Sequence, residues 1–267
     1  MATARWRYAV PNAFTAASIV FAVLAIEDAI AGRVVAAMWW CLYGTLTDRL
    51  DGAAAKMLKA QSAFGVQFDS LADLTIFGIA PPAVFYAFYA HHPEAGWSTP
   101  WLRAALAALC ATWTLATAIR LARFNVASAT GPIAHYTGTP STMTAGIVGV
   151  AFLTALKYSD AAWTAPESSD PWRLLGPARL DATLPFLPLL LLLGAIGMLS
   201  PLRVPKLGRT RSRALTVVLA VTVAFGYGAG LFHRLPEYML AGGLVYLCAC
   251  IIFNVRSIVA ERALRAG

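Results

Sequence analysis

The sequence predicts an all-α, polytopic membrane protein with about eight transmembrane helices, organised as a single domain over residues 1–267. Three observations support this fold class. Hydrophobic residues make up 59% of the chain and charged residues 13%, whereas soluble domains are about a quarter charged. The mean hydropathy is +0.64. Apolar runs of the length needed to cross a membrane, about 20 residues, recur along the whole chain.

Eight apolar segments follow one another in the sequence. They cover approximately residues 11–31, 34–59, 66–90, 101–124, 140–158, 184–200, 213–232 and 236–256. We expect the segments between about 11 and 200 to form the core of the domain. The last two, within about 213–256, are additional helices without distinctive motifs.

Local signals support the segments in order. The first follows two arginines, and the second and third are joined by a short turn around residues 59–64. The fourth ends at a pair of arginines. The fifth is entered through Gly138 and Pro140, which favour a turn. The sixth is rich in leucine and begins near Pro185 and Pro188, and a polar segment, 159–183, precedes it.

The distribution of basic residues predicts the orientation. If both termini are cytoplasmic, 15 of the 21 Lys and Arg residues fall on the cytoplasmic side, as expected from retention of positive loops. Residues 159–183 then form the one long outer loop. We attribute the net charge of +8 to topology and anionic lipid, and expect no nucleic-acid partner. The predicted location is a multi-pass protein of the bacterial inner membrane.

Four aspartates stand out because a carboxylate within a membrane segment costs several kcal/mol. Asp48 and Asp51 are three residues apart, and Asp69 and Asp73 are four apart, so each pair shares one helix face. A tight hairpin between the second and third helices would direct both pairs into one cavity at their cytoplasmic ends. Arg49 and Lys56 are too few to neutralise four carboxylates, and a salt-bridged seam therefore explains the pattern less well than a cation site.

Oxygen-only ligands favour Mg²⁺ or Mn²⁺, with Ca²⁺ as a further candidate. Two divalent ions about 4 Å apart can stabilise both the attacking and the leaving oxygen of a phosphoryl transfer. Gly52 and Gly65 have no side chain, so a substrate or another backbone can approach closely. We therefore expect two metal ions and phosphoryl-transfer chemistry.

The run from Asp48 to Asp73 has the form D-x2-D-G-x2-A-K-x8-G-x3-D-x3-D and resembles the signature of the CDP-alcohol phosphotransferases. That family has Arg where this chain has Lys56. Segments 11–15, 61–82, 119–126 and 198–209 resemble the membrane-embedded bacterial phosphatidylserine synthases of this family. The resemblance spans about residues 8–210.

The resemblance implies a transfer of the phosphatidyl group from CDP-diacylglycerol to L-serine, giving phosphatidylserine and CMP. Metal ligands would be Asp48, Asp51, Asp69 and Asp73, and Asp73 would also accept the proton of the acceptor hydroxyl. The CDP site would comprise Asn12, Thr15, Gly52, Ala55, Lys56 and Gly65. Helix capping is an alternative role for Asn12 and Thr15. Family members are typically homodimers, which we also expect here.

The acceptor site is expected at the cytoplasmic end of the fourth helix. Arg120 and Arg123 share a helix face beside Asn125, an arrangement that suits an anionic, hydrogen-bonding ligand such as the serine carboxylate. Thr139 and Ser141 offer hydroxyls near the same surface. Positive-inside anchoring remains an alternative for the two arginines, and helix capping for the hydroxyls.

Two other functions remain open from the sequence. The same chemistry could use glycerol phosphate, inositol phosphate, inositol or choline as the acceptor. A divalent-cation transporter is a remote alternative, because buried acids also mark ion pathways. A transporter would require polar residues across the full depth of the membrane, whereas these acids lie near one face.

Overall fold

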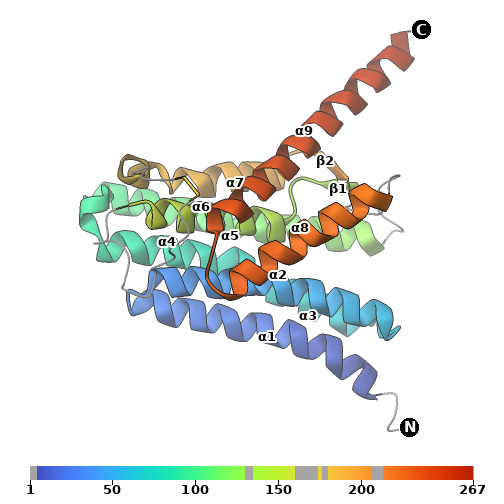
Figure 1. The fold of residues 1–267 in the computed structure, drawn as a ribbon, viewed down its shortest axis with the longest axis horizontal. Helices are drawn as coiled ribbons and strands as arrows, with labels where there is room; N and C mark the ends of the chain where they lie inside the picture. Colours follow the sequence, from blue (N-terminus) through green and yellow to red (C-terminus); the bar gives the residue numbers. More distant parts are fainter. Residues whose placement is uncertain (1–4, 130–134, 160–173, 176–179, 206–212, 267) are drawn as a thin grey trace.

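The computed structural model describes residues 5–129, 135–159, 174–175, 180–205 and 213–266. This part of the chain is a helical bundle with one small β-ladder, and most of its helices run roughly parallel to one another (Figure 1). The expected outer loop, 159–183, lies mostly outside the described residues. The predicted helical class is therefore observed.

The predicted helices are found close to their expected bounds. In the first half these are α1 (Arg5–Ile30), α2 (Val34–Met57), α3 (Ala63–Asp73), a π-helical segment η2 (Leu74–Ile79), α4 (Ala80–His91), a 3₁₀ turn η3 (Pro93–Ala95) and α5 (Pro100–Ala129). In the second half they are β1 (His135–Thr137), α6 (Ser141–Lys157), a 3₁₀ segment η6 (Asp181–Phe186), α7 (Leu189–Leu199), β2 (Arg203–Pro205), α8 (Arg213–Leu231) and α9 (Pro236–Ala266). The predicted third segment is thus three consecutive helical pieces.

Four helical stretches of the described chain are long and apolar enough to cross a membrane. They cover Trp6–Ile30, Ala63–His91, Pro100–Ser128 and Pro236–Asn254. The helix α2 has comparable length, but its last ten residues include Asp48, Arg49, Asp51 and Lys56. Several long apolar helices indicate a multi-pass integral membrane protein, and eight spans stay a prediction.

The core forms where α1 packs along α2 and where aromatic side chains of α4 and α6 meet. Phe85 and Phe88 on α4 and Phe152 on α6 are fully buried, and the Phe85 and Phe152 rings lie 4.7 Å apart between centroids. Burial of large aromatic side chains of this kind stabilises helix packing. These contacts fix the position of α4, which continues from the helix that carries Asp69 and Asp73.

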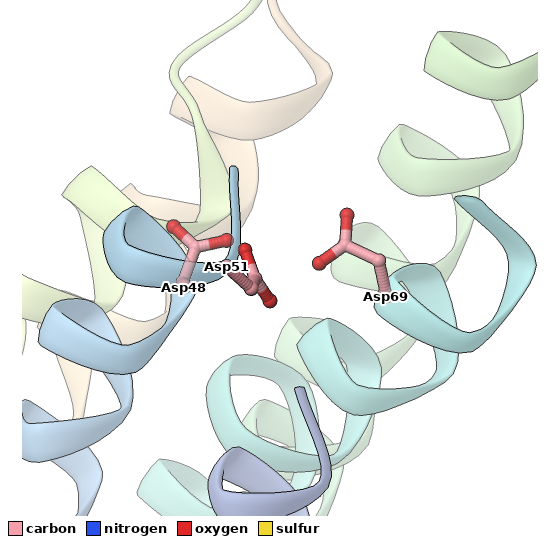
Figure 2. Close-up of side chains that lie close together, drawn as sticks. All are labelled: Asp48, Asp51 and Asp69. Atoms are coloured by element: carbon pink, nitrogen blue, oxygen red, sulfur yellow. The ribbon is translucent and has the colours of Figure 1, made fainter. Parts of the chain in front are cut away.

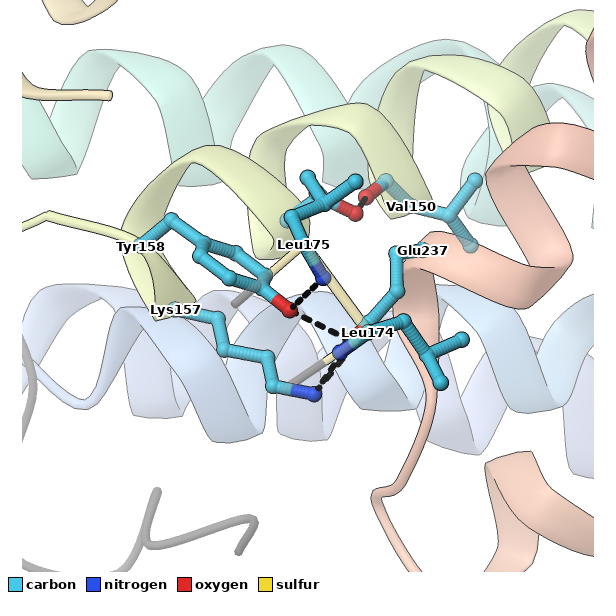
Figure 3. Close-up of polar contacts among 7 residues, drawn as sticks. Val150, Lys157, Tyr158, Leu174, Leu175 and Glu237 are labelled. Atoms are coloured by element: carbon cyan, nitrogen blue, oxygen red, sulfur yellow. Dashed lines mark hydrogen bonds and ion pairs between the residues drawn. The ribbon is translucent and has the colours of Figure 1, made fainter. Parts of the chain in front are cut away.

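The C-terminal pair of helices is attached to the core by a buried polar cluster (Figure 3). Glu237, at the start of α9, accepts hydrogen bonds of 2.8 and 3.0 Å from Lys157 Nζ and of 2.8 Å from Tyr158 Oη. The amide N–H of Leu174 also donates to Glu237, at 3.2 Å. One carboxylate therefore joins α9, the end of α6 and the segment that follows α6.

A two-stranded antiparallel ladder, absent from the sequence prediction, ties the chain after α5 to the chain after α7. His135 pairs with Pro205 and Thr137 with Arg203. Gly138 follows with a φ of +78°, and its N–H donates to the Leu202 carbonyl at 2.8 Å. A Cβ at Gly138 would collide with the Met198 carbonyl. This turn sets where α6 begins.

The N-terminus and the α2–α3 turn lie at the same end of the bundle, and α9 projects beyond the other helices toward that side (Figure 1). All four aspartates belong to the helices that meet at this turn. The candidate site is therefore at one end of the bundle, near the N-terminus.

Candidate functional site

Three aspartates from two helices converge on one point. Asp48 and Asp51 project from α2, and Asp69 projects from α3 toward them (Figure 2). Each contributes a carboxylate oxygen, and these oxygens lie within 4.8 Å of one another. The hairpin geometry expected from the sequence is therefore present for these three residues.

A short, well-capped turn creates this convergence. The backbone reverses between Leu58 and Ser62, and Ser62 caps α3 by accepting a 3.0 Å hydrogen bond from the Gly65 N–H. Such a cap satisfies one of the free amide groups at a helix start. From α1, Arg7 Nη2 donates to the Leu58 carbonyl at 2.6 Å. The turn is thus held at both of its ends.

The fourth aspartate, Asp73, lies beside this group of three. Its carboxyl group interacts electrostatically with that of Asp48, and the charge of Arg120 acts on both residues. Arg120 comes from α5 and is buried. Since a buried guanidinium requires a nearby negative charge, the aspartates and Arg120 form one electrostatic unit.

Hydroxyl groups from two other helices hold the carboxylates in place. Thr15 on α1 donates to Asp51 Oδ2 at 2.8 Å, and Thr142 on α6 donates to Asp48 Oδ2 at 3.3 Å. One turn from Thr15, Ser18 and Thr47 are hydrogen bonded at 2.6 Å. Thr142 follows Ser141 in the chain and was not among the residues predicted for the acceptor site.

The residues predicted to bind CDP come from α1, α2 and α3. Nothing lies within 4 Å of the position that a Cβ at Gly52 would take, so this backbone is open to a ligand. Gly65 faces Asn12, whose Oδ1 would lie 3.6 Å from a Cβ there. Lys56 is exposed and Ala55 is partly exposed. Thr15 differs from the others, because it is buried against Asp51 and contacts the carboxylate directly.

The residues predicted to bind the acceptor are divided between two locations. Arg120 is close enough to Asp48 and Asp73 for its charge to act on both, and it donates a 2.7 Å hydrogen bond to Ser141 Oγ. Asn125 donates at 2.9 Å to the hydroxyl of Ser70, the residue after Asp69. Arg123 is exposed and points to the Leu199 carbonyl at 3.4 Å. Thr139 is buried and accepts a hydrogen bond from Thr144. Among the predicted acceptor residues, Arg120, Ser141 and Asn125 are therefore the ones linked to the region of the aspartates.

The donor set of this site fits a hard divalent cation. Asp48, Asp51 and Asp69 supply oxygen only, which Mg²⁺ and Mn²⁺ prefer. Their mutual proximity concentrates negative charge at a place where burial makes uncompensated charge costly. Thr15 and Thr142 supply the outer hydrogen bonds that usually orient metal-binding side chains. The residues present therefore fit the metal site expected from the sequence.

Comparison with known proteins agrees with this geometry. Residues 8–169 match the CDP-alcohol phosphatidyltransferase family, a region that includes all four aspartates. A relative from Helicobacter pylori J99 is 36% identical over 151 residues, which cover 57% of this chain and 60% of the relative. One from Mycobacterium tuberculosis H37Rv is 34% identical over 161 residues, covering 58% of this chain and 52% of the relative.

A third relative, from Bacillus subtilis 168, is 30% identical over 118 residues, covering 44% of this chain and 61% of the relative. All three are named CDP-diacylglycerol–serine O-phosphatidyltransferase. The matches therefore span between about half and three fifths of the length of these relatives. Because the family match covers more than half of the chain and contains the carboxylate site, this protein belongs to the CDP-alcohol phosphatidyltransferase family.

Proposed function

We propose that this protein transfers the phosphatidyl group of CDP-diacylglycerol to L-serine, giving phosphatidylserine and CMP. The observation that carries this proposal is the convergence of Asp48, Asp51 and Asp69 within the region that matches the family. The names of the three relatives support serine as the acceptor.

Two metal ions, Mg²⁺ or Mn²⁺, would be held by Asp48, Asp51 and Asp69, with Asp73 as the adjacent fourth ligand. When bound, they would supply the positive charge that stabilises the phosphate oxygens during transfer. Positioning and charge neutralisation are the main requirements of phosphoryl transfer, and neither requires a covalent intermediate with the protein.

The protein's own residues have separate roles in this proposal. The serine hydroxyl oxygen forms a bond to the phosphorus next to the diacylglycerol, the bond from that phosphorus to CMP breaks, and Asp73 accepts the hydroxyl proton. Arg120 binds the serine carboxylate, with Ser141 holding its guanidinium and Asn125 near the same surface. Lys56 faces the phosphates, and the bare backbone at Gly52 admits the nucleotide.

The proposal also includes the orientation of the protein in the membrane, its cellular location and its oligomeric state. The end of the bundle that carries the aspartates faces the cytoplasm, in accord with the distribution of basic residues, and both termini are on that side. We propose a multi-pass protein of the bacterial inner membrane that forms a homodimer. Crosslinking in native membranes tests the dimer.

The experiment that tests the function is CMP release by purified protein in detergent, with CDP-diacylglycerol and Mn²⁺ or Mg²⁺. We expect release to depend on L-serine and to yield phosphatidylserine. Glycerol phosphate, inositol phosphate, inositol and choline serve as competing acceptors in parallel reactions. Release only with one of these alcohols would replace serine as the acceptor, and no release with any of them would contradict the function.

A further inference from the structure

Two adjacent prolines lie in the first turn of α4, in the helical stretch that continues from α3 with Asp69 and Asp73. Pro81 and Pro82 are buried and lie within the continuous helical stretch from Ala63 to His91. Proline has no backbone N–H and cannot donate to the carbonyl four residues before it. The carbonyls of Phe77 and Gly78 therefore lack the donors that an uninterrupted α-helix would give them.

The neighbouring helix α5 supplies replacement donors to these two carbonyls. Trp113 Nε1 donates to the Phe77 carbonyl at 2.8 Å, and Thr114 Oγ1 donates to the Gly78 carbonyl at 2.7 Å. The Thr114 hydroxyl also lies 3.1 Å from the Cys110 carbonyl of its own helix. Trp113 is fully buried, and Gly194 on α7 leaves room for its indole ring. In a membrane, such side chains satisfy carbonyls that proline has freed.

The stretch just before the prolines is the π-helix η2, and it begins at the residue after Asp73. Its closing hydrogen bond runs from the Ala80 N–H to the Thr75 carbonyl, five residues back. A π turn holds one more residue than an α turn, which rotates α3 relative to α4 by about 100°. Because Phe85 and Phe88 fix α4 in the core, the π turn determines which way α3 faces.

We propose that Trp113 and Thr114 are positioning residues that hold this π turn and thereby direct Asp69 and Asp73 toward Asp48 and Asp51. Neither residue touches the carboxylates. The role in the reaction rests on the proposed function, whereas the role in the π turn does not. Without these two donors, the stretch after Asp73 would satisfy its carbonyls in other ways and the two aspartates would lose their fixed direction.

The first test uses Thr114→Val, which removes one donor and keeps the shape of the side chain, and Trp113→Phe, which removes the indole N–H together with part of the buried ring. We expect each variant to lower kcat about tenfold, because one buried carbonyl loses its hydrogen-bond donor and the cost of that loss corresponds to about a factor of ten. The KM for serine should change little. Thr112→Val is the matched control, because Thr112 is exposed and its hydroxyl bonds only the Ala108 carbonyl of its own helix. It should behave as the wild type does.

The second test restores the missing backbone donor. Pro82→Ala returns an N–H that can bond the Gly78 carbonyl, so Thr114→Val should lose most of its effect in that background. Trp113→Phe should keep its effect there, because the Phe77 carbonyl depends on position 81. Equal effects of Thr114→Val in both backgrounds would overturn the proposal.

Hydrogen–deuterium exchange provides a readout that does not depend on activity. Amides of residues 74–80 should exchange faster in Thr114→Val than in the wild type or in Thr112→Val, with residues 84–91 unchanged. Unaltered exchange at 74–80, or faster exchange with a normal kcat, would overturn the proposal. If the wild type releases no CMP with any acceptor, the proposed function fails, and the exchange pattern still decides whether Trp113 and Thr114 hold the π turn.

Discussion

The hydroxyl of Thr15 on α1 donates a 2.8 Å hydrogen bond to the carboxylate of Asp51 on α2. Both residues are buried, with exposed fractions of 3% and 7%. This hydrogen bond fixes the orientation of the carboxylate, which lies within 4.8 Å of those of Asp48 and Asp69. The first helix is thus part of the candidate metal site, although it contributes no ligand of its own.

We predict that Thr15→Val raises the Mn²⁺ concentration needed for half-maximal activity about tenfold, because loss of an outer hydrogen bond weakens a metal ligand. Valine keeps the shape of the side chain, so the helix packing should persist. A Mn²⁺ titration of CMP release measures the change, with Thr112→Val as the control. An unchanged Mn²⁺ requirement would show that Asp51 does not need this hydroxyl.

We predict that Asp69→Asn and Asp73→Asn each abolish measurable turnover. The first loses a negatively charged metal ligand, and the second loses both a ligand and the group that accepts the serine proton. Glu94→Gln, in the 3₁₀ turn distant from the site in sequence, is the control and should leave CMP release unchanged. Near-normal activity in either aspartate variant would contradict the proposed mechanism.

Lys56 stands where the family pattern has arginine, and it is exposed at the end of α2. Arginine binds a phosphate through two parallel hydrogen bonds, whereas lysine acts as a point charge. We therefore predict that Lys56→Arg lowers KM for CDP-diacylglycerol several-fold, while Lys56→Ala raises it. Lys59→Arg, in the following turn, is the matched control. A lower activity in Lys56→Arg would mean that this site has adapted to lysine.

Arg120 and Arg123 share a helix face in sequence but have different surroundings. Arg120 acts on Asp48 and Asp73, whereas Arg123 reaches the end of α7. We predict that Arg120→Gln raises KM for serine at least about tenfold, as expected for loss of a charged hydrogen bond, and that Arg123→Gln changes it little. Kinetics at saturating CDP-diacylglycerol separate the two. Equal effects would argue against Arg120 as the serine-carboxylate residue.

The Lys157–Glu237 pair is buried, with side-chain exposures of 8% and 5%. Removing one partner of such a pair leaves a buried charge and costs about 3–5 kcal/mol. We predict that Glu237→Gln lowers the thermal unfolding temperature in detergent markedly, while Glu94→Gln, whose carboxylate is 60% exposed beside His92, has little effect.

A double variant separates the charge from the packing at this cluster. In Lys157→Met with Glu237→Leu, both buried charges are gone, so most of the lost stability should return. If the double variant is no more stable than Glu237→Gln, then losing the acceptor for the Tyr158 hydroxyl and the Leu174 N–H costs as much stability as removing the two charges returns.

Local patterns allowed much of this protein to be predicted. The helices follow from apolar runs of membrane length, and the two aspartate pairs follow from spacings of three and four residues, which place side chains on one helix face. The closeness of the pairs follows from the short turn at residues 59–64, because a tight turn leaves two helices few ways to pack. None of these inferences needs a contact between distant parts of the chain.

Other features depend on how each helix is rotated in the bundle, which no local pattern specifies. The partners Thr15 and Asp51 are 36 residues apart, and Thr142 and Asp48 are 94 apart. The π turn after Asp73 could likewise not be predicted from the sequence. The two prolines indicate only that two carbonyls lose their backbone donors, not how the chain replaces them. Local patterns of residues are sufficient to predict the helices, the acidic helix faces and the family resemblance. Tertiary packing alone decided which hydroxyls hold each carboxylate, which arginine faces them and which side chains replace the missing N–H groups, because these contacts form only when separate helices meet.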